Sequence, residues 1–217
     1  MGCNCVKHLK SERRNDLATK TCFNEAEIGA LYELFRKLSS SITDDGLISK
    51  EEFWIGLFRI NKKQSLLADR IFQLFDFKHD GVIDFEEFVL SLNVFHPEAP
   101  QAEKVAFSFH LYDICQTGYI QQKEVKQLIL ALLDESDLTF PDDVIEAIIR
   151  KTFMDVDKKG DGKIDVEEWK EFVIHNPLLL KHMTVPYLKT CKAGRLDDNP
   201  ITETQRFTNS FKTPFPI

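Results

Sequence analysis

The sequence predicts an all-α protein of four helix–loop–helix units in two paired lobes, with short strand pairing between loops and a C-terminal extension. Two observations predict this fold. First, an apolar segment at helical spacing, a polar loop with glycine and a second apolar segment occur four times in the 217 residues. Second, each loop carries isoleucine two residues after the glycine and glutamate four residues later. The copies are Gly46-Ile48-Glu52, Gly81-Ile83-Glu87, Gly118-Ile120-Glu124 and Gly162-Ile164-Glu168.

This pattern is typical of the EF-hand, in which two helices flank a 12-residue calcium loop. Glycine at the sixth loop position permits the sharp bend that brings oxygen atoms round one ion. In EF-hands the eighth residue turns inward, where it pairs with the neighbouring loop in a short strand. Glutamate at the twelfth position offers two oxygens to a hard cation. We therefore expect Ca²⁺ as the cofactor.

Capping residues mark where several of the helices begin. A capping box places Ser, Asp or Asn before the first helical residue and Glu three residues later. Behind the first box, the apolar residues Ile28, Leu31, Leu34, Phe35 and Leu38 follow one helical face. The boxes are Asn24 with Glu27, Ser49 with Glu52, and Asp84 with Glu87.

Pro97 and Pro100 interrupt the chain between the second and third units, so we place the boundary of the two lobes there. Residues 1–21 are expected to form a flexible tail. The first pair of hands occupies residues 22–96, with loops 39–52 and 76–87, and the second occupies 97–176, with loops 113–124 and 157–168. Residues 177–217 form the extension, a candidate lid over a binding groove.

The second and fourth loops have the richer sets of calcium ligands, because each keeps four carboxylates. Both have lysine, Lys78 and Lys159, at the third position, where water or a main-chain carbonyl must complete the coordination because an ammonium cannot. We expect both loops to bind, less tightly than a fully acidic loop. The expected ligands are Asp76, Asp80, Val82 (carbonyl), Asp84 and Glu87 in one loop, and Asp157, Lys159, Asp161, Lys163 (carbonyl), Asp165 and Glu168 in the other.

The third and first loops are poorer in charge. The third offers Asp113, Thr117, Tyr119 and Glu124, with Cys115 at the third position, and a thiol suits calcium badly. In the first, counting back from Gly46 leaves two acidic ligands, Asp45 and Glu52, after a serine run that begins at Ser39. By charge alone the first loop is empty, and for both loops a purely structural role stays open.

Composition excludes several classes of protein. The net charge of −7 disfavours nucleic acid as the main partner. The longest apolar run, residues 128–133, is far shorter than the ~20 residues of a membrane-spanning helix. Five cysteines without a regular framework indicate a reducing compartment, and Cys3, Cys5 and His8 have no later partners for a zinc site. No catalytic constellation is present, so an enzyme is not expected.

The chain resembles the plant calcineurin B-like calcium sensors over roughly residues 20–190. The resemblance rests on the serine-rich 14-residue first loop, on linkers of 23, 25 and 32 residues between loops, and on the segment 176–188 after the fourth hand. It implies a non-catalytic regulatory subunit that docks an autoinhibitory helix of a calcineurin B-like-interacting serine/threonine kinase and relieves autoinhibition. It also implies that the first loop binds calcium through main-chain carbonyls. A passive calcium buffer and a regulatory protein of the calcineurin B or neuronal-sensor type are the alternatives.

An opened pair of hands exposes an apolar groove that accepts an amphipathic helix. Any one groove candidate is more often a core residue, because apolar stripes on helices mostly pack inward. The chain has three methionines, so a stiff groove rich in phenylalanine predicts a narrow set of partners. The candidates are Phe53, Trp54, Leu57, Phe58, Phe72, Phe75, Phe88, Leu92 and Phe95 in the first lobe, and Phe107, Leu111, Leu128, Leu132, Phe153, Trp169 and Phe172 in the second.

The two ends suggest modification. Gly2 is a candidate for N-myristoylation, although Val6 stands where the pattern prefers Ser or Thr, and Cys3 and Cys5 are candidates for S-acylation. Basic residues outnumber acidic ones in the first 21 residues, which favours anionic lipid. We expect the cytoplasmic face of a membrane, plasma or vacuolar, with a cytosolic pool. Ser210 is the nearest match to the serine that partner kinases phosphorylate in the family.

Overall fold

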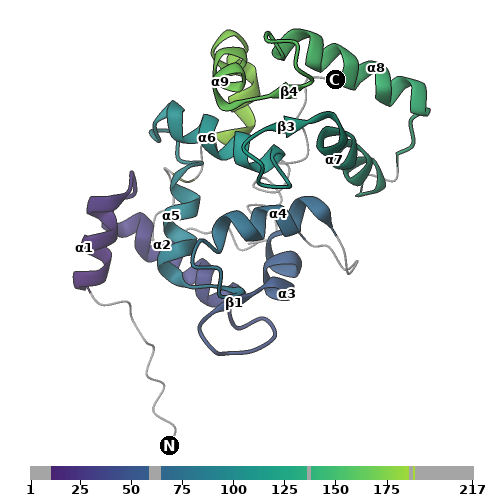
Figure 1. The fold of residues 1–217 in the computed structure, drawn as a ribbon. Coiled ribbons are helices and arrows are strands. Elements are labelled where there is room, and N and C mark those ends of the chain that lie inside the picture. Colours follow the sequence, from purple (N-terminus) through teal and green to yellow (C-terminus); the bar gives the residue numbers. More distant parts are fainter. Residues whose placement is uncertain (1–10, 59–64, 136–137, 186–187, 189–217) are drawn as a thin grey trace, which may run out of the picture.

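The computed structural model describes residues 11–58, 65–135, 138–185 and 188. Helices dominate this part of the chain, and the strands are two residues long (Figure 1). The predicted all-α fold of paired EF-hands is therefore confirmed. The elements are α1 (Ser11–Lys20), α2 (Glu25–Leu38), β1 (Ile48–Ser49), α3 (Lys50–Phe53), the π-helix η1 (Trp54–Phe58), α4 (Leu66–Phe75), β2 (Val82–Ile83), α5 (Phe85–Asn93), α6 (Gln101–Tyr112), β3 (Ile120–Gln121), α7 (Gln122–Glu135), α8 (Asp142–Val156), β4 (Lys163–Ile164), α9 (Val166–His175) and the 3-10 helix η2 (Pro177–Met183).

Each pair of loops is joined by a two-stranded antiparallel sheet. In the first lobe β1 pairs with β2, so that Ile48 lies opposite Ile83. In the second, β3 pairs with β4, and Ile120 lies opposite Ile164. All four isoleucines are buried. The eighth loop position therefore makes the inter-loop contact that the sequence pattern predicts.

The predicted capping boxes are present at three helices, and a fourth begins α9. At α2, the Asn24 side chain accepts from the Glu27 amide, and the Glu27 carboxylate accepts from the Asn24 amide. The boxes at α3 and α5 have the same reciprocal bonds, and Asp165 forms the box at α9. Each box satisfies amides at a helix N-terminus that have no partner within the helix.

The expected flexible tail over residues 1–21 is wrong for its second half. Residues 11–20 form α1, which packs against α2 and α5. The buried Leu17 anchors it, and Lys20 forms ion pairs with Asp16 and Glu86. The high charge of this segment obscured its two apolar residues at the core, Leu17 and Ala18. Residues 1–10 lie outside the described part of the chain.

One contiguous apolar core runs through both lobes. Helix α4 of the first lobe packs against α6 and α7 of the second, and Figure 1 shows α4 lying between the two lobes. Helix η2 then packs on α6 and α9, which carries Leu180 and Met183 into the same core. Within the described residues, no helix combines the length and the apolar character that crossing a membrane requires.

Candidate calcium-binding loops

In loop 2 (residues 76–87) main-chain amides hold the carboxylates at both ends. The buried Asp76 accepts from the amides of Asp80 (3.1 Å) and Gly81 (2.9 Å). Glu87, which is fully buried, accepts from the amides of Lys78 and Asp84, both at 3.0 Å. Gly81 has φ +84°, a left-handed conformation that favours glycine. Main-chain amides of the loop thus hold the carboxylates of its first and twelfth residues in place.

Loop 4 (residues 157–168) repeats these contacts. Asp157 accepts from the amides of Asp161 (3.2 Å) and Gly162 (2.8 Å), and Glu168 accepts from those of Lys159 (2.9 Å) and Asp165 (3.1 Å). The predicted ligands of loops 2 and 4 therefore lie at equivalent places in the two lobes.

Both third-position lysines fold over their own loops. The Lys78 ammonium pairs with Asp84 and lies 3.8 Å from Glu87, and the Lys159 ammonium pairs with Asp165. The side-chain hydrogen bond from Lys159 holds the pKa of Asp165 below its usual value. The third position of loop 4, where water or a main-chain carbonyl is expected to complete the coordination, thus places the positive charge of Lys159 on one of the ligands.

Loop 3 (residues 113–124) has the same frame with fewer charges. Asp113 accepts from the amides of Thr117 and Gly118, both at 2.8 Å, and Glu124 accepts from that of Cys115 at 2.8 Å. The Thr117 hydroxyl donates to the carbonyl of Tyr119 at 3.1 Å. The carbonyl oxygen of Tyr119 is at the seventh position, where an EF-hand loop offers a main-chain oxygen to calcium. In loop 3 this oxygen accepts a hydrogen bond from Thr117.

Loop 1 departs from the others only at its beginning. Glu52 accepts from the amides of Thr43 (3.2 Å) and Ser49 (2.9 Å), which are the third and ninth positions counted from Gly46. Burial alone would raise the pKa of Glu52, but these hydrogen bonds together hold it below its usual value. Ser39, an expected ligand, is the buried C-cap residue of α2, and its hydroxyl contacts the carbonyl of Arg36.

A recurrent turn at the fifth position shows that loop 1 keeps the EF-hand register after its serine run. The fifth-position aspartate accepts from the amide two residues on, at 2.9 Å in loop 1, 3.2 Å in loop 2 and 3.0 Å in loop 4. The three aspartates are Asp45, Asp80 and Asp161.

Four carboxylates and a main-chain carbonyl fit the hard oxygen chemistry of calcium in loops 2 and 4. No three acidic, histidine or cysteine side chains converge on one point among the described residues, and EF-hand loops add carbonyl oxygens to their side chains.

The seventh-position residues Val82 and Lys163 lie in the paired strands. The Lys163 ammonium lies 5.1 Å from the ring centre of Tyr119, so the seventh positions of loops 3 and 4 are in contact.

Arg70, a buried residue of α4, also contacts loop 3, although no motif in the sequence marks it. Its guanidinium donates to the carbonyls of His110 (2.6 and 3.1 Å) and Asp113 (2.9 Å), where α6 enters loop 3. Burial lowers its pKa, and the acidic Asp113 and Glu124 act in the opposite direction. In the sequence, Arg70 is a lone arginine within the apolar residues of its helix. Because arginine is rarely buried without partners, this position indicates a buried, hydrogen-bonded side chain.

The structure places most groove candidates in the core. Ten are buried, and the four partly buried ones border that core: Trp54, Phe107, Leu132 and Phe172. Leu57 and Phe58 lie in η1, but their side chains are not described. The buried ten are Phe53, Phe72, Phe75, Phe88, Leu92, Phe95, Leu111, Leu128, Phe153 and Trp169.

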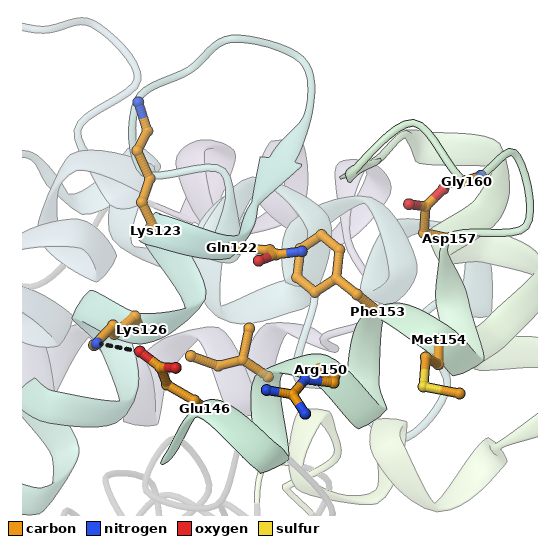
Figure 2. A pocket seen from close by; sticks show the side chains of 10 residues that line it. Gln122, Lys123, Lys126, Glu146, Arg150, Phe153, Met154, Asp157 and Gly160 are labelled. Atoms are coloured by element: carbon orange, nitrogen blue, oxygen red, sulfur yellow. Dashed lines mark hydrogen bonds and ion pairs between the residues drawn. The ribbon is translucent and has the colours of Figure 1, made fainter. Parts of the chain in front are cut away.

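A cavity of about 560 Å³ lies between α7, α8 and loop 4. Figure 2 shows side chains that line it. Phe153 and the exposed Met154 line it from α8, and Asp157 and Gly160 border it from the loop. Lys126 and Glu146 form an ion pair of 3.3 Å across it. The cavity therefore opens beside the first ligand of loop 4.

Two family models match the chain: an EF-hand domain pair over residues 102–173 and an EF hand domain over residues 67–94. Calcineurin B-like protein 5 of Arabidopsis thaliana is 48% identical over 192 residues, which cover 87% of this chain and 95% of that protein. The chain belongs to the calcineurin B-like family. The predicted family and the Ca²⁺ cofactor are thus confirmed, and we describe the protein as an EF-hand calcium sensor.

More distant similarity extends to calcineurin B itself. The calcineurin B of Naegleria gruberi is 32% identical over 82% of this chain and 96% of its own length. The calcineurin B of Schizosaccharomyces pombe is 35% identical over 76% of this chain and 90% of its own length. This calcineurin B-like chain is thus related over most of its length to proteins whose names describe them as subunits of calcineurin.

Proposed function

We propose that this protein is the calcium-dependent regulatory subunit of a serine/threonine kinase of the calcineurin B-like-interacting type. The observation that carries the proposal is the 48% identity to a calcineurin B-like protein over 87% of the chain. The sensor binds calcium, opens its paired hands and accepts the kinase's autoinhibitory helix, which relieves autoinhibition. It supplies no catalytic group of its own.

Docking of a helix requires the lobes to open, because ten of the groove candidates are buried. Trp54 is a groove candidate at the margin of the core. It is partly buried at the start of η1, and among the described residues its indole N–H has no hydrogen-bond partner. The Lys50 ammonium lies 4.9 Å from its ring centre. An amphipathic helix would cover the indole ring and offer a carbonyl to its N–H.

The C-terminal extension supports a lid over this groove. The Lys104 ammonium donates to the carbonyl of Met183 (3.0 Å) and the hydroxyl of Thr184 (2.9 Å). The amide of Val185 donates to the carbonyl of Phe95 (2.9 Å), a groove candidate at the end of the first lobe. We propose that this segment leaves its place when the kinase helix binds.

Calorimetry with a synthetic peptide of the kinase's autoinhibitory motif tests the proposal. We expect binding in calcium and at least tenfold weaker binding in chelator, with calcium affinity raised reciprocally by the peptide. Equal peptide affinity in calcium and in chelator would contradict the proposal. A chain ending at residue 176 is expected to bind the peptide more tightly, and unchanged affinity would exclude the lid. Lys104→Met, which removes the bonds to Met183 and Thr184 together with the bond to the carbonyl of His96, is the milder variant.

A second candidate partner is a catalytic protein of the calcineurin type, because several relatives are named as calcineurin B. Competition between the kinase peptide and a peptide of the phosphatase's B-binding helix separates the two. A passive calcium buffer would bind neither peptide, and would show no calcium-dependent binding of a hydrophobic dye.

We further propose attachment to the cytoplasmic face of a membrane through Gly2, Cys3 and Cys5, and phosphorylation at Ser210. These residues lie outside the described part of the chain. One myristoyl chain anchors only marginally, so S-acylation and the basic residues around it are needed for stable attachment. Mass spectrometry of the protein from eukaryotic cells tests both modifications. Gly2→Ala is expected to abolish membrane association, and its persistence would contradict the proposed anchor.

A further inference from the structure

Loops 2 and 4 contain the same internal ion pair. In each, the ammonium of the third-position lysine reaches six residues along the chain to the ninth-position aspartate. The pairs are Lys78 with Asp84 and Lys159 with Asp165. Lys78 also lies 3.8 Å from Glu87, the twelfth-position ligand. Two loops in different lobes therefore share one charge arrangement.

The ninth-position carboxylates use both oxygens in these contacts. In Asp84, Oδ1 accepts from the amide of Glu87 in the first turn of α5 (2.9 Å), and Oδ2 contacts the lysine. In Asp165, Oδ1 accepts from the equivalent amide of α9 (2.9 Å), and Oδ2 again contacts the lysine. The oxygen that the helix cap leaves open is thus held by the ammonium in both loops.

Loops 1 and 3 contain neither half of this pair. Their third positions are Thr43 and Cys115, and their ninth positions are Ser49 and Gln121. Lysine therefore accompanies aspartate only in the two loops with four carboxylates. Both side chains are cations at neutral pH, because lysine ordinarily loses its proton only near pH ~10.

We propose that Lys78 and Lys159 are intramolecular counter-ions that compete with calcium for the open oxygen of the ninth-position carboxylate. Calcium and the ammonium are both cations and use the same ligands, so the lysine leaves the loop when the ion binds. The lysines thereby raise the calcium concentration at which loops 2 and 4 fill. Before calcium binds, they neutralise part of the acidic charge of these loops. This inference concerns calcium affinity and does not depend on the kinase partner.

Calcium titration calorimetry of single variants at ~0.15 M salt tests the inference, because that salt screens distant charges. We expect Lys159→Met to bind calcium in loop 4 roughly two- to fivefold more tightly than the wild type, the size of an exposed ion pair. Lys78→Met is expected to give the larger gain, since Lys78 approaches two carboxylates.

Lys158→Met is the matched control. Lys158 is the adjacent residue of loop 4, is exposed, and forms no ion pair among the described residues. The control removes the same charge from the same loop but leaves the ion pair of Lys159 with Asp165 in place. We therefore expect little change in calcium affinity. Lys159→Arg keeps the charge and is expected to stay close to the wild type. Equal effects of Lys158→Met and Lys159→Met, or weaker binding in Lys159→Met, would overturn the proposal.

A second measurement does not use calcium. In chelator, a double-mutant cycle of Lys159→Gln and Asp165→Asn measures the coupling of the pair in denaturant unfolding. We expect non-additive effects in this cycle and additive effects when Lys158→Gln replaces Lys159→Gln. Additivity in both cycles would also overturn the counter-ion role.

Discussion

Loops 3 and 4 face each other across the strands of the second lobe, and they share a backbone frame while differing in charge. In both, the first-position aspartate accepts the amides of the fifth and sixth residues, and the twelfth-position glutamate accepts those of the third and ninth. Loop 4 adds carboxylates at the fifth and ninth positions, where loop 3 has Thr117 and Gln121. Loop 2 in turn exceeds loop 1 at the first and ninth positions, where loop 1 has Ser41 and Ser49 in place of Asp76 and Asp84.

This comparison separates two roles of the EF-hand sequence. Positions one, six, eight and twelve make the loop fold and pair, and all three loops of regular length carry the same residue types there. Positions three, five and nine set the charge around the ion, and these vary. Each lobe therefore joins a loop rich in carboxylates to a poorer one, and we expect the two kinds of loop to differ in calcium affinity.

The largest effect is expected from Glu168→Gln. It removes the bidentate carboxylate of a loop with four carboxylates, so calcium affinity at loop 4 should fall about hundredfold or more. Calorimetry resolves the loss as one missing tight site. Glu167→Gln, an exposed neighbour at the eleventh position, is the control and should leave that site in place. If both variants retain it, loop 4 is not the tight site of its lobe.

Arg70→Met tests whether the two grades of loop are held together through α4. It would leave the carbonyls of His110 and Asp113 without their buried donor, which costs ~2–3 kcal/mol of unfolding free energy. Denaturant unfolding in calcium measures this loss. The exposed Arg150→Met of α8 should change stability little. A loss of the same size in Arg150→Met would show that the lost charge is responsible, and not the hydrogen bonds from Arg70 to the carbonyls of His110 and Asp113.

Substitution should remove the difference in charge between loops 3 and 4. Cys115→Asp with Gln121→Asp gives loop 3 four carboxylates, and we expect its calcium affinity to rise about tenfold or more. Calorimetry should then show one further tight site. Cys115→Asn with Gln121→Asn is the neutral control. If the acidic pair has no effect, the hydroxyl of Thr117 on the carbonyl of Tyr119 limits loop 3 instead.

The smallest effect is expected in acid. The hydrogen bond from Lys159 holds the pKa of Asp165 below its ordinary value of 3.8. The contribution of this carboxylate to stability is therefore complete above pH 3.8 and is lost as the pH falls through the lower, folded-state pKa. The dependence of unfolding free energy on pH, measured in chelator across this range, should be steeper in the wild type than in Asp165→Asn. Gln121→Asn in loop 3, where the ninth residue does not titrate, should not change the slope.

Much of the fold could be predicted because its determinants are local. The glycine at the bend and the capping boxes depend on residues within one loop or one helix turn, and the isoleucines that pair between loops recur at the same position of each loop. Helix α1 escaped prediction because its only large apolar residue is Leu17, which is buried where α1 packs against α2 and α5. The ion pairs of Lys78 and Lys159 also escaped, because loop position does not show where a long side chain turns.

By itself, the sequence determined the four loops, their pairing and the division between carboxylate-rich and carboxylate-poor sites, since spacing and charge are written along the chain. Tertiary structure decided how the lobes are joined and what is covered. Arg70 meets α6 only after α4 packs across the lobes, and Lys104 reaches Met183 only after the chain returns on itself, 79 residues later. Burial likewise depends on this packing, because an apolar helical stripe has the same spacing whether it lies in a core or lines a groove.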